Sequence, residues 1–437
     1  MLSIIIILSI ALAIFLGYRT KINTGLFCIV FAYIIGCFVM GLKPKQIIGF
    51  WPTSTMFVIL SVSLFYNFAA INGTLEKMSG ALLYACRNFP GLLPYALFAV
   101  AVILSVMGAT FFTVLAFLAP ITLVICDESR MDKLTGAVAI NCGALAGGNF
   151  PTSNLGVVFR GLSDTAYEAS PEIAAVDSFN MEMKIFAFAI FFSLILITIF
   201  RFGFKENRNI GKGVTFKKPE NFTKDQKTTL TLMMAMMAVV LIFPLLNILM
   251  PGNAAVKYIS GKVDVGLVAI IFTVIALLLK LAPQKEAIAK VPWNTIIMIA
   301  GAGMLIAVAV EAGTIEALST WIGSNVPKPL VPIAFCLVGA IMSFFSSTTG
   351  VVAPALFPLI PNLAASVGLS APVLFACTIL GAQSSAISPF SSGGSLILGS
   401  TPKEEERNEL FNRLLMVAVP ISVITCTIYN FVIAMVL

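Results

Sequence analysis

The sequence has no histidine and few charged residues. Histidine is the usual proton carrier near neutral pH and the commonest metal ligand, so its absence removes the ordinary proton relay. Only 11% of the residues are charged, and the interiors of the long apolar segments hold essentially no Asp, Glu, Lys or Arg; Glu311 stands at a segment end. The eight cysteines form no Cys-X-X-Cys pair or metal spacing, so neither a disulfide framework nor a zinc site is expected.

The chain is rich in apolar residues. They make up 59% of the chain, and the mean hydropathy is +1.01. Repeated segments of about 20 apolar residues are typical of membrane-spanning helices. The net charge of +7 lies in the loops, where it orients a membrane protein, so no nucleic-acid partner is expected. The first seventeen residues lack a basic region and a cleavage site, and we interpret them as a retained span.

Two apolar segments contain residues that disfavour a continuous helix. Residues 143–156 read GALAGGNFPTSNLG, and residues 381–394 read GAQSSAISPFSSGG, 238 positions later. A proline and a serine align, as Pro151 with Pro389 and Ser153 with Ser391. Irregular backbone at membrane depth is tolerated only where protein buries it or water reaches it. A matched pair of such breaks predicts a transporter's substrate site.

Two longer apolar stretches, 92–126 and 330–367, are interrupted near their middles at Met107–Thr110 and Ser346–Thr349. Each is too long for one span and has no polar loop to separate two, which predicts a re-entrant helical hairpin. Broken helices are predicted at 134–159 and 371–399, and interfacial helices at 75–87 and 313–322. Full spans are predicted near 2–16, 25–42, 53–71, 185–204, 228–250, 265–281, 295–310 and 410–437.

The order of elements is the same in residues 1–204 and 228–437, with residue matches at offsets of 238 to 240. Each half has five crossings, and this odd number makes the repeat inverted. The basic segment 205–227 is predicted to be a cytoplasmic linker. The fold class is therefore an all-α polytopic membrane protein, an inverted repeat of two five-span halves, each with a re-entrant hairpin and a broken helix.

The breaks and hairpin tips would gather helix ends near the membrane midplane. Helix N-termini suit an anion, whereas helix C-termini and free carbonyls suit a sodium ion. Hydroxyl and amide side chains can serve either ligand, although serine and threonine in spans often only bond to their own helix. The candidate substrate-binding residues are Thr110, Thr152, Ser153, Asn154, Ser347, Thr348, Thr349, Ser391 and Ser392. The candidate sodium ligands are Gly108, Thr110, Asn149, Ser153, Ser346, Thr348, Ser388 and Ser391.

The chain resembles the ion transporter superfamily and its divalent anion–sodium symporters, and residues 21–120 look most like the malonate/C4-dicarboxylate carrier branch. Family members carry Ser-Asn-Thr at each hairpin tip; here the tips read Gly108-Ala109-Thr110 and Ser346-Ser347-Thr348. The resemblance implies a homodimer with an elevator-type transport domain. It also implies one sodium between Thr110 and residues 149–153, a second between residues 346–349 and 388–392, and a dicarboxylate between the tips.

These observations predict a secondary transporter, not an enzyme, that imports small dicarboxylates of the malonate, succinate and malate class through the cell inner (plasma) membrane. Sodium is the expected coupling ion, because a proton-coupled carrier usually holds an ionisable residue within the membrane. No organic cofactor is expected. A proton-coupled organic-anion or citrate carrier and an ion antiporter of the same superfamily remain the alternatives. An intramembrane enzyme would need a nucleophile–base pair or a metal cluster, and a channel would not explain paired hairpins.

Overall fold

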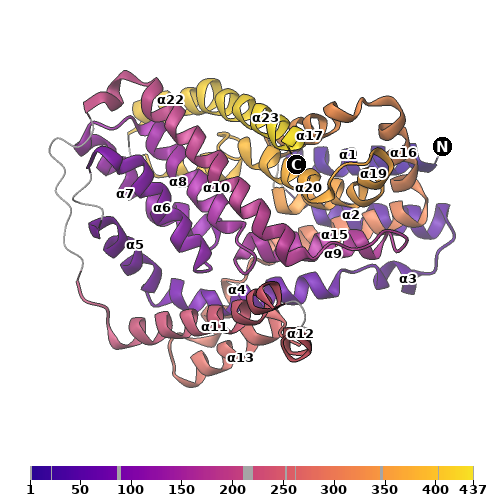
Figure 1. The fold of residues 1–437 in the computed structure, drawn as a ribbon, viewed down its shortest axis with the longest axis horizontal. Coiled ribbons are helices and arrows are strands. Elements are labelled where there is room, and N and C mark those ends of the chain that lie inside the picture. Colours follow the sequence, from indigo (N-terminus) through magenta and orange to yellow (C-terminus); the bar gives the residue numbers. More distant parts are fainter. Residues whose placement is uncertain are drawn as a thin grey trace.

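The computed structural model describes residues 2–20, 22–85, 90–209, 220–250, 253–260, 262–344, 348–401 and 403–436. These residues form helices and connecting turns, with no strand among them. In Figure 1, α1, α2, α15 and α16 gather on one side and α5 to α8 on the other, while α4 lies along the packed α11 and α13. Within the described residues, segments 178–203, 348–367 and 404–436 are long and apolar enough to cross a membrane, and nine shorter apolar helices accompany them.

The first half of the chain contains ten α-helices. They are α1 (Leu2–Thr20), α2 (Thr24–Tyr33), α3 (Pro44–Gly49), α4 (Thr53–Ile71), α5 (Thr74–Ala85), α6 (Leu93–Val106), α7 (Phe111–Ser129), α8 (Lys133–Gly148), α9 (Asn154–Glu168) and α10 (Ser178–Gly203). A short π-helix, η1 (Ile34–Val39), extends α2, so the second predicted span is one rod with a wider turn at its end.

The described residues from 224 onward contain thirteen α-helices. They are α11 (Lys224–Leu249), α12 (Ala254–Ser260), α13 (Val265–Leu278), α14 (Gln284–Ala289), α15 (Trp293–Glu311), α16 (Thr314–Asn325), α17 (Val331–Phe344), α18 (Ala353–Leu356), α19 (Ile360–Val367), α20 (Ala371–Ser384), α21 (Ser392–Gly399), α22 (Glu404–Arg413) and α23 (Val419–Val436). The π-helices η6 (Thr348–Val352) and η8 (Leu414–Ala418) precede α18 and α23. Of the predicted linker 205–227, residues 210–219 lie outside the described part of the chain.

Close helix packing recurs at matching positions of the two halves. A Cβ on Gly143 of α8 would lie 2.5 Å from the Phe98 carbonyl oxygen of α6, and a Cβ on Gly381 of α20 would collide with the Cys336 carbonyl of α17. Both members of the second pair stand 238 residues after those of the first. Since glycine has no Cβ, it allows two backbones to approach closely, as is usual between helices in membranes.

The two halves also pack across each other. Gly25 of α2 lies against the Ile297 backbone of α15, and Gly266 of α13 lies against Val58 of α4. A Cβ added to Gly266 would lie 3.2 Å from the Val58 Cα. Helix α2 of the first half therefore contacts α15 of the second, and α4 of the first half contacts α13 of the second. Neither half buries these glycine faces within itself.

The start of α10 differs from the sequence-based expectation. The polar residues up to Lys184 predicted a loop, with the span beginning near residue 185. Instead α10 begins at Ser178, because the Asp177 side chain accepts a hydrogen bond from the Asn180 N–H at 2.7 Å and caps the helix. Glu182 consequently lies in the first two turns of a spanning helix and is fully buried. The prediction of a loop up to Lys184 is therefore wrong from Ser178 onward.

Candidate functional site

The first helix break joins α8 to α9. Helix α8 ends at Gly148, and α9 begins at Asn154 with Ser153 at its N-cap. Pro151 has no N–H to continue the helical ladder, which allows the break. The Ser153 hydroxyl donates to the Phe150 carbonyl at 2.8 Å and also to the Gly148 carbonyl. These contacts fold the break into a compact turn with its carbonyl oxygens gathered around one hydroxyl.

The second break, between α20 and α21, has the same construction. Helix α20 ends at Ser384, and Ser391 stands at the N-cap of α21. The Ser391 hydroxyl donates to the Ser388 carbonyl at 2.8 Å and to the Ala386 carbonyl at 2.5 Å. All three residues stand 238 positions after their counterparts in the first break. Each serine hydroxyl therefore donates its proton to carbonyls of its own turn, which is the alternative that the sequence left open. Each hydroxyl oxygen can still accept a hydrogen bond or bind a cation.

A reciprocal amide pair connects the two breaks. The Asn149 amide donates to the Gln383 side-chain oxygen at 3.0 Å, and the Gln383 amide donates to the Asn149 oxygen at 2.7 Å. Both side chains are buried. The C-terminal ends of α8 and α20 are thus held together by two hydrogen bonds between residues 234 positions apart.

The two hairpin tips lie beside these breaks. At the first tip Gly108 has a φ of +91°, and the Thr110 hydroxyl accepts from the Thr113 N–H at 3.2 Å, which caps the start of α7. At the second tip Thr348 begins η6, and its hydroxyl lies 3.3 Å from the Ser343 hydroxyl. The candidates Ser346 and Ser347 lie outside the described residues, as does the side chain of Ser392.

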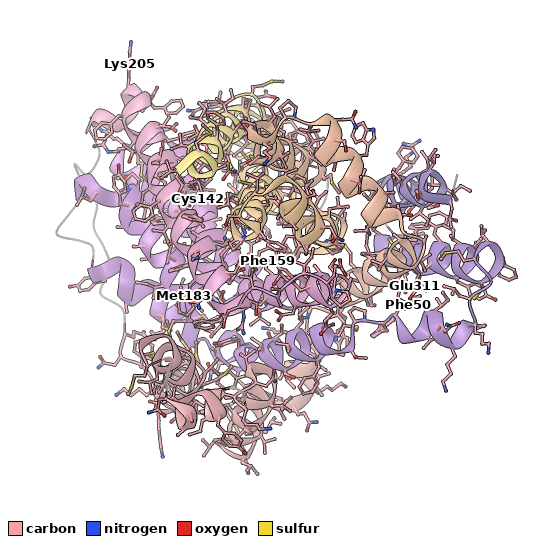
Figure 2. The ribbon with its side chains drawn as sticks, turned by 45° about the vertical axis from the view of Figure 1, so that its right-hand side comes forward. Phe50, Cys142, Phe159, Met183, Lys205 and Glu311 are labelled. Carbon is pink, nitrogen blue, oxygen red and sulfur yellow. The ribbon has the colours of Figure 1, made fainter. Side chains whose placement is uncertain are left out.

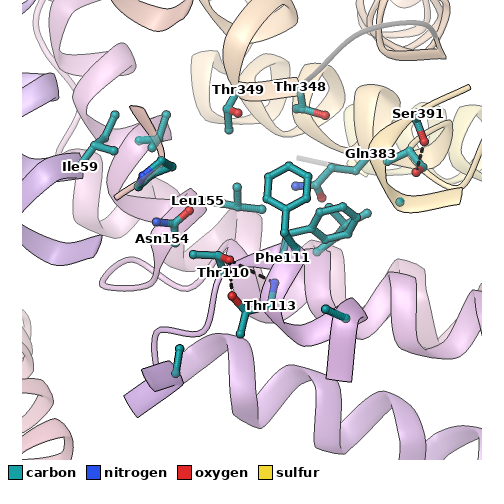
Figure 3. Close-up of a pocket in the computed structure, with 18 of the residues that line it drawn as sticks. Ile59, Thr110, Phe111, Thr113, Asn154, Leu155, Thr348, Thr349, Gln383 and Ser391 are labelled. Carbon is teal, nitrogen blue, oxygen red and sulfur yellow. Dashed lines mark hydrogen bonds between the residues drawn. The ribbon is translucent and has the colours of Figure 1, made fainter. Parts of the chain in front are cut away.

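A cavity of about 440 Å³ opens between the tips and the breaks (Figure 3). Five of the candidate residues line it: Thr110, Asn154, Thr348, Thr349 and Ser391. Four other candidates, Asn149, Thr152, Ser153 and Ser388, are buried in the break turns and do not line it, and Gly108 stands at the first tip. The volume falls within the range usual for small-molecule sites.

Sequence reasoning missed five polar residues of this cavity: Asn67, Thr113, Lys290, Ser343 and Gln383. Lys290 corrects the expectation that the site has no basic residue. It follows α14, in a loop that joins the cavity only through the tertiary fold. Gln383 had a usable signal, because it stands inside the repeated glycine segment 381–394.

The cavity wall contains groups that can bind an anion. Helices α7 and α9 both begin at its wall, at Phe111 and Asn154, and helix N-termini carry partial positive charge. The remaining wall is largely apolar and includes Phe111, Phe112, Phe117, Leu155 and Val158. In the described part of the chain no group of three or more His, Cys, Asp or Glu side chains could hold a metal ion. A cation here would therefore be bound by hydroxyl, amide and carbonyl oxygens.

A second cavity, of about 490 Å³, lies at the opposite ends of α4 and α15 from the first cavity. Pro52 of the α4 N-cap lines it, whereas its counterpart Pro292, 240 positions later, lines the first cavity. Ala70 of the first cavity and Val310 of the second are related by the same offset. Phe50 and Glu311, labelled in Figure 2, both line the second cavity, together with Arg160, Asp164, Glu168 and Asp264.

Comparison with known families and structures agrees with this architecture. Residues 1–148 match the model of the dicarboxylate carrier protein MatC N-terminus, and residues 255–435 match the citrate transporter model. The YdaH transporter of Alcanivorax borkumensis is similar in structure, with a TM-score of 0.65, 18% identity, and 89% of this chain and 87% of that chain covered. MtrF of Neisseria gonorrhoeae, described as an antimetabolite efflux pump, has a TM-score of 0.63 at 14% identity over 92% and 84% of the chains. No curated protein matches the chain.

The described residues include helices long and apolar enough to cross a membrane, and carrier-family models match residues 1–148 and 255–435. These matches make the chain a membrane transporter of organic anions and not an enzyme.

Proposed function

We propose that the protein is a secondary active transporter that imports small dicarboxylates of the malonate, succinate and malate class by sodium symport. The observation that carries the proposal is the 440 Å³ cavity, where two helix N-termini and hydroxyl or amide side chains of both halves meet. One carboxylate would bind at Thr110 and Asn154. The other would bind near Thr348 and Thr349, with Lys290 attracting the dianion.

The break turns supply suitable sodium ligands. Sodium, like other hard cations, prefers oxygen donors. The Gly148 and Phe150 carbonyls converge on the Ser153 hydroxyl, and the Ala386 and Ser388 carbonyls converge on Ser391. We assign one sodium to the first turn, with Thr110, Gly108 and Asn149 nearby, and a second to the other turn with Thr348 and the 346–347 tip. Sodium at these positions would partly neutralise a bound dianion.

Alternating access would follow from an inverted repeat. Equivalent glycine contacts, equivalent break turns and two cavities lined by residues 240 positions apart support such a repeat. In this proposal α6 to α9 and α17 to α21 form re-entrant hairpins and broken helices that move together, in an elevator-type shift, against α4 and α15. The first cavity would face the cytoplasm, where the 205–227 linker lies. The protein would be a homodimer in the inner membrane.

Uptake of labelled malonate and succinate into proteoliposomes, with and without an inward sodium gradient, tests the proposal. We expect sodium-dependent accumulation. Thr110→Ala, Asn154→Ala and Thr348→Ala should each reduce uptake at equal protein amount by about ten- to hundredfold, because each removes a hydrogen bond to a charged ligand. The control is Thr231→Ala, whose exposed hydroxyl bonds only the Lys227 carbonyl. Wild-type uptake in all three site variants would overturn the site assignment.

A second candidate is a proton-coupled carrier of citrate or another organic anion. The citrate transporter match over residues 255–435 favours it. Uptake of citrate in preference to malonate and succinate would establish this alternative substrate. Accumulation driven by a proton gradient without sodium would establish the alternative coupling, and the two outcomes are independent.

A further inference from the structure

One carboxylate in the membrane region has no place in the transport site described above. Glu182 of α10 is fully buried, and neither of its carboxylate oxygens has a hydrogen-bond partner in the described part of the chain. It also takes part in none of the ion pairs formed there. An ionised carboxylate that is buried without a partner is so unfavourable that it binds a proton instead.

The cation that faces Glu182 is Arg160, on the neighbouring helix α9. Arg160 Nη1 donates to the Pro151 carbonyl of the first break at 3.2 Å, and its guanidinium lies over the Phe179 ring at 5.3 Å. The Arg160 Nε is buried and has no partner. Arg160 therefore reaches the break with one nitrogen and keeps unused donor capacity beside an unused carboxylate.

Other charged groups surround Arg160 but do not replace Glu182. Asp164 on α9, Asp177 at the α10 N-cap and Asp264 at the α13 N-cap also face it. Asp177 and Asp264 already accept backbone N–H groups as helix caps, and Asp164 accepts from the Ser178 hydroxyl at 3.3 Å. Arg160 and Asp164 line the second cavity, whereas Glu182 is fully buried and is not among the residues that line it.

We propose that Glu182 is a proton-binding site of the transporter, and that Arg160 transmits its charge to the break at residues 149–153. With Glu182 protonated, Arg160 holds the Pro151 carbonyl, as in the structure. When Glu182 releases its proton to solvent, the carboxylate attracts Arg160, which lines the second cavity, and the Pro151 carbonyl is freed. The step moves one proton and exchanges one hydrogen bond for an ion pair.

The sign of the effect on transport follows from electrostatics. A guanidinium bound at the break repels a cation in the same turn. Deprotonation of Glu182 draws this charge away, so sodium affinity of the break rises with pH. This part rests on the proposed sodium symport, whereas the protonation of Glu182 does not. The half-buried Glu406 carboxylate differs from Glu182 because it is already paired, with Lys133 at 2.6 Å and with Lys403 at 2.8 Å.

The first test measures the apparent sodium affinity of wild type and variants at several pH values between about 5 and 8. In wild type we expect the apparent affinity to rise with pH by about 5- to 150-fold, the range usual for coupled sites. Glu182→Gln imitates the protonated state and should keep the low-pH affinity throughout. Glu172→Gln, which removes an exposed carboxylate that lines neither cavity, should retain the wild-type profile. The ionisation of the substrate is the same for wild type and variants, so a difference between their pH profiles comes from the protein. An unchanged pH profile in Glu182→Gln would overturn the coupling to the break.

A second test does not need transport. Infrared difference spectra of the purified protein in lipid, recorded between low and high pH, should contain the C=O stretch of a protonated carboxyl group that Glu182→Gln lacks. Arg160→Gln should keep this band and lose the pH dependence of sodium affinity, which separates the proton site from its transmission. Absence of the band in well-folded wild-type protein would overturn the proton site. Its presence without any dicarboxylate uptake would support the site and contradict the proposed function alone.

Discussion

At the scale of single residues, the Asn149–Gln383 amide pair is the contact that unites the two breaks. Each amide is buried and satisfies the other, and the pair lies where the C-terminal ends of α8 and α20 meet. The loss of stability depends on whether one partner of the pair is removed or both. Removing one partner leaves the other buried without hydrogen bonds, whereas removing both leaves only a packing change.

Asn149→Leu should therefore destabilise the protein by about 1–3 kcal/mol, because it leaves the Gln383 amide unpaired. The double variant Asn149→Leu/Gln383→Met should lose less than the sum of the two single variants. Thermal unfolding in detergent measures both effects. Asn325→Ala, which removes an exposed side chain bonded only to the Trp321 carbonyl, is the control and should change little. Strictly additive losses would mean that the two amides do not act as a pair.

At the scale of elements, closely packed helix pairs support the breaks. Helix α8 lies on α6 through Gly143, and α20 lies on α17 through Gly381. A break at membrane depth needs a rigid neighbour, because the backbone groups of the turn are fixed only by protein. The matching glycines give both breaks the same kind of support.

Gly143→Ala and Gly381→Ala should each lower stability by about 1–3 kcal/mol, because the added Cβ meets a backbone carbonyl that cannot move aside. Unfolding temperature in detergent measures the loss. In Gly203→Ala, the last residue of α10, nothing lies within 4 Å of the added Cβ, so stability should stay at or above wild type. Equal behaviour of all three variants would show that the close approach is not structurally important.

At the scale of the whole molecule, the two cavities are the feature that relates fold to transport. They lie at opposite ends of α4 and α15 and share the hairpin and break elements as one wall. If the two cavities are the two access routes, each should be open to the aqueous solution on a different side of the membrane.

Cysteines introduced at Ala70 and Ala307, in a background without native cysteines, test this in oriented vesicles. A membrane-impermeant thiol reagent should label Ala70→Cys from the cytoplasmic side and Ala307→Cys from the other side. Sodium with substrate should slow labelling of Ala70→Cys at least severalfold. Ala189→Cys, fully buried, should stay unlabelled. Labelling of both cavity positions from one side would contradict alternating access through these cavities.

Much of this arrangement could be predicted from local sequence. Pro151 and Pro389 mark the two breaks, and Thr110 marks the first tip, because proline and helix caps act within a few residues. Lys290 and Gln383 were missed because the fold alone brings them to the cavity. Glu182 was missed for a different reason: Asp177 and Ser178 resemble a loop in composition, yet Asp177 caps a helix that carries the carboxylate inward.

The crosswise packing of α2 on α15 and of α4 on α13 also governs how the chain is made. When α2 leaves the ribosome, the backbone that will cover Gly25 lies about 270 residues further along the chain. At usual rates of synthesis its glycine face waits for roughly a quarter of a minute to a minute before α15 is inserted. Throughout that interval the glycine face lacks the α15 backbone that later packs on it. The first half of this protein is therefore a nascent intermediate that becomes complete only when its partner half has been translated.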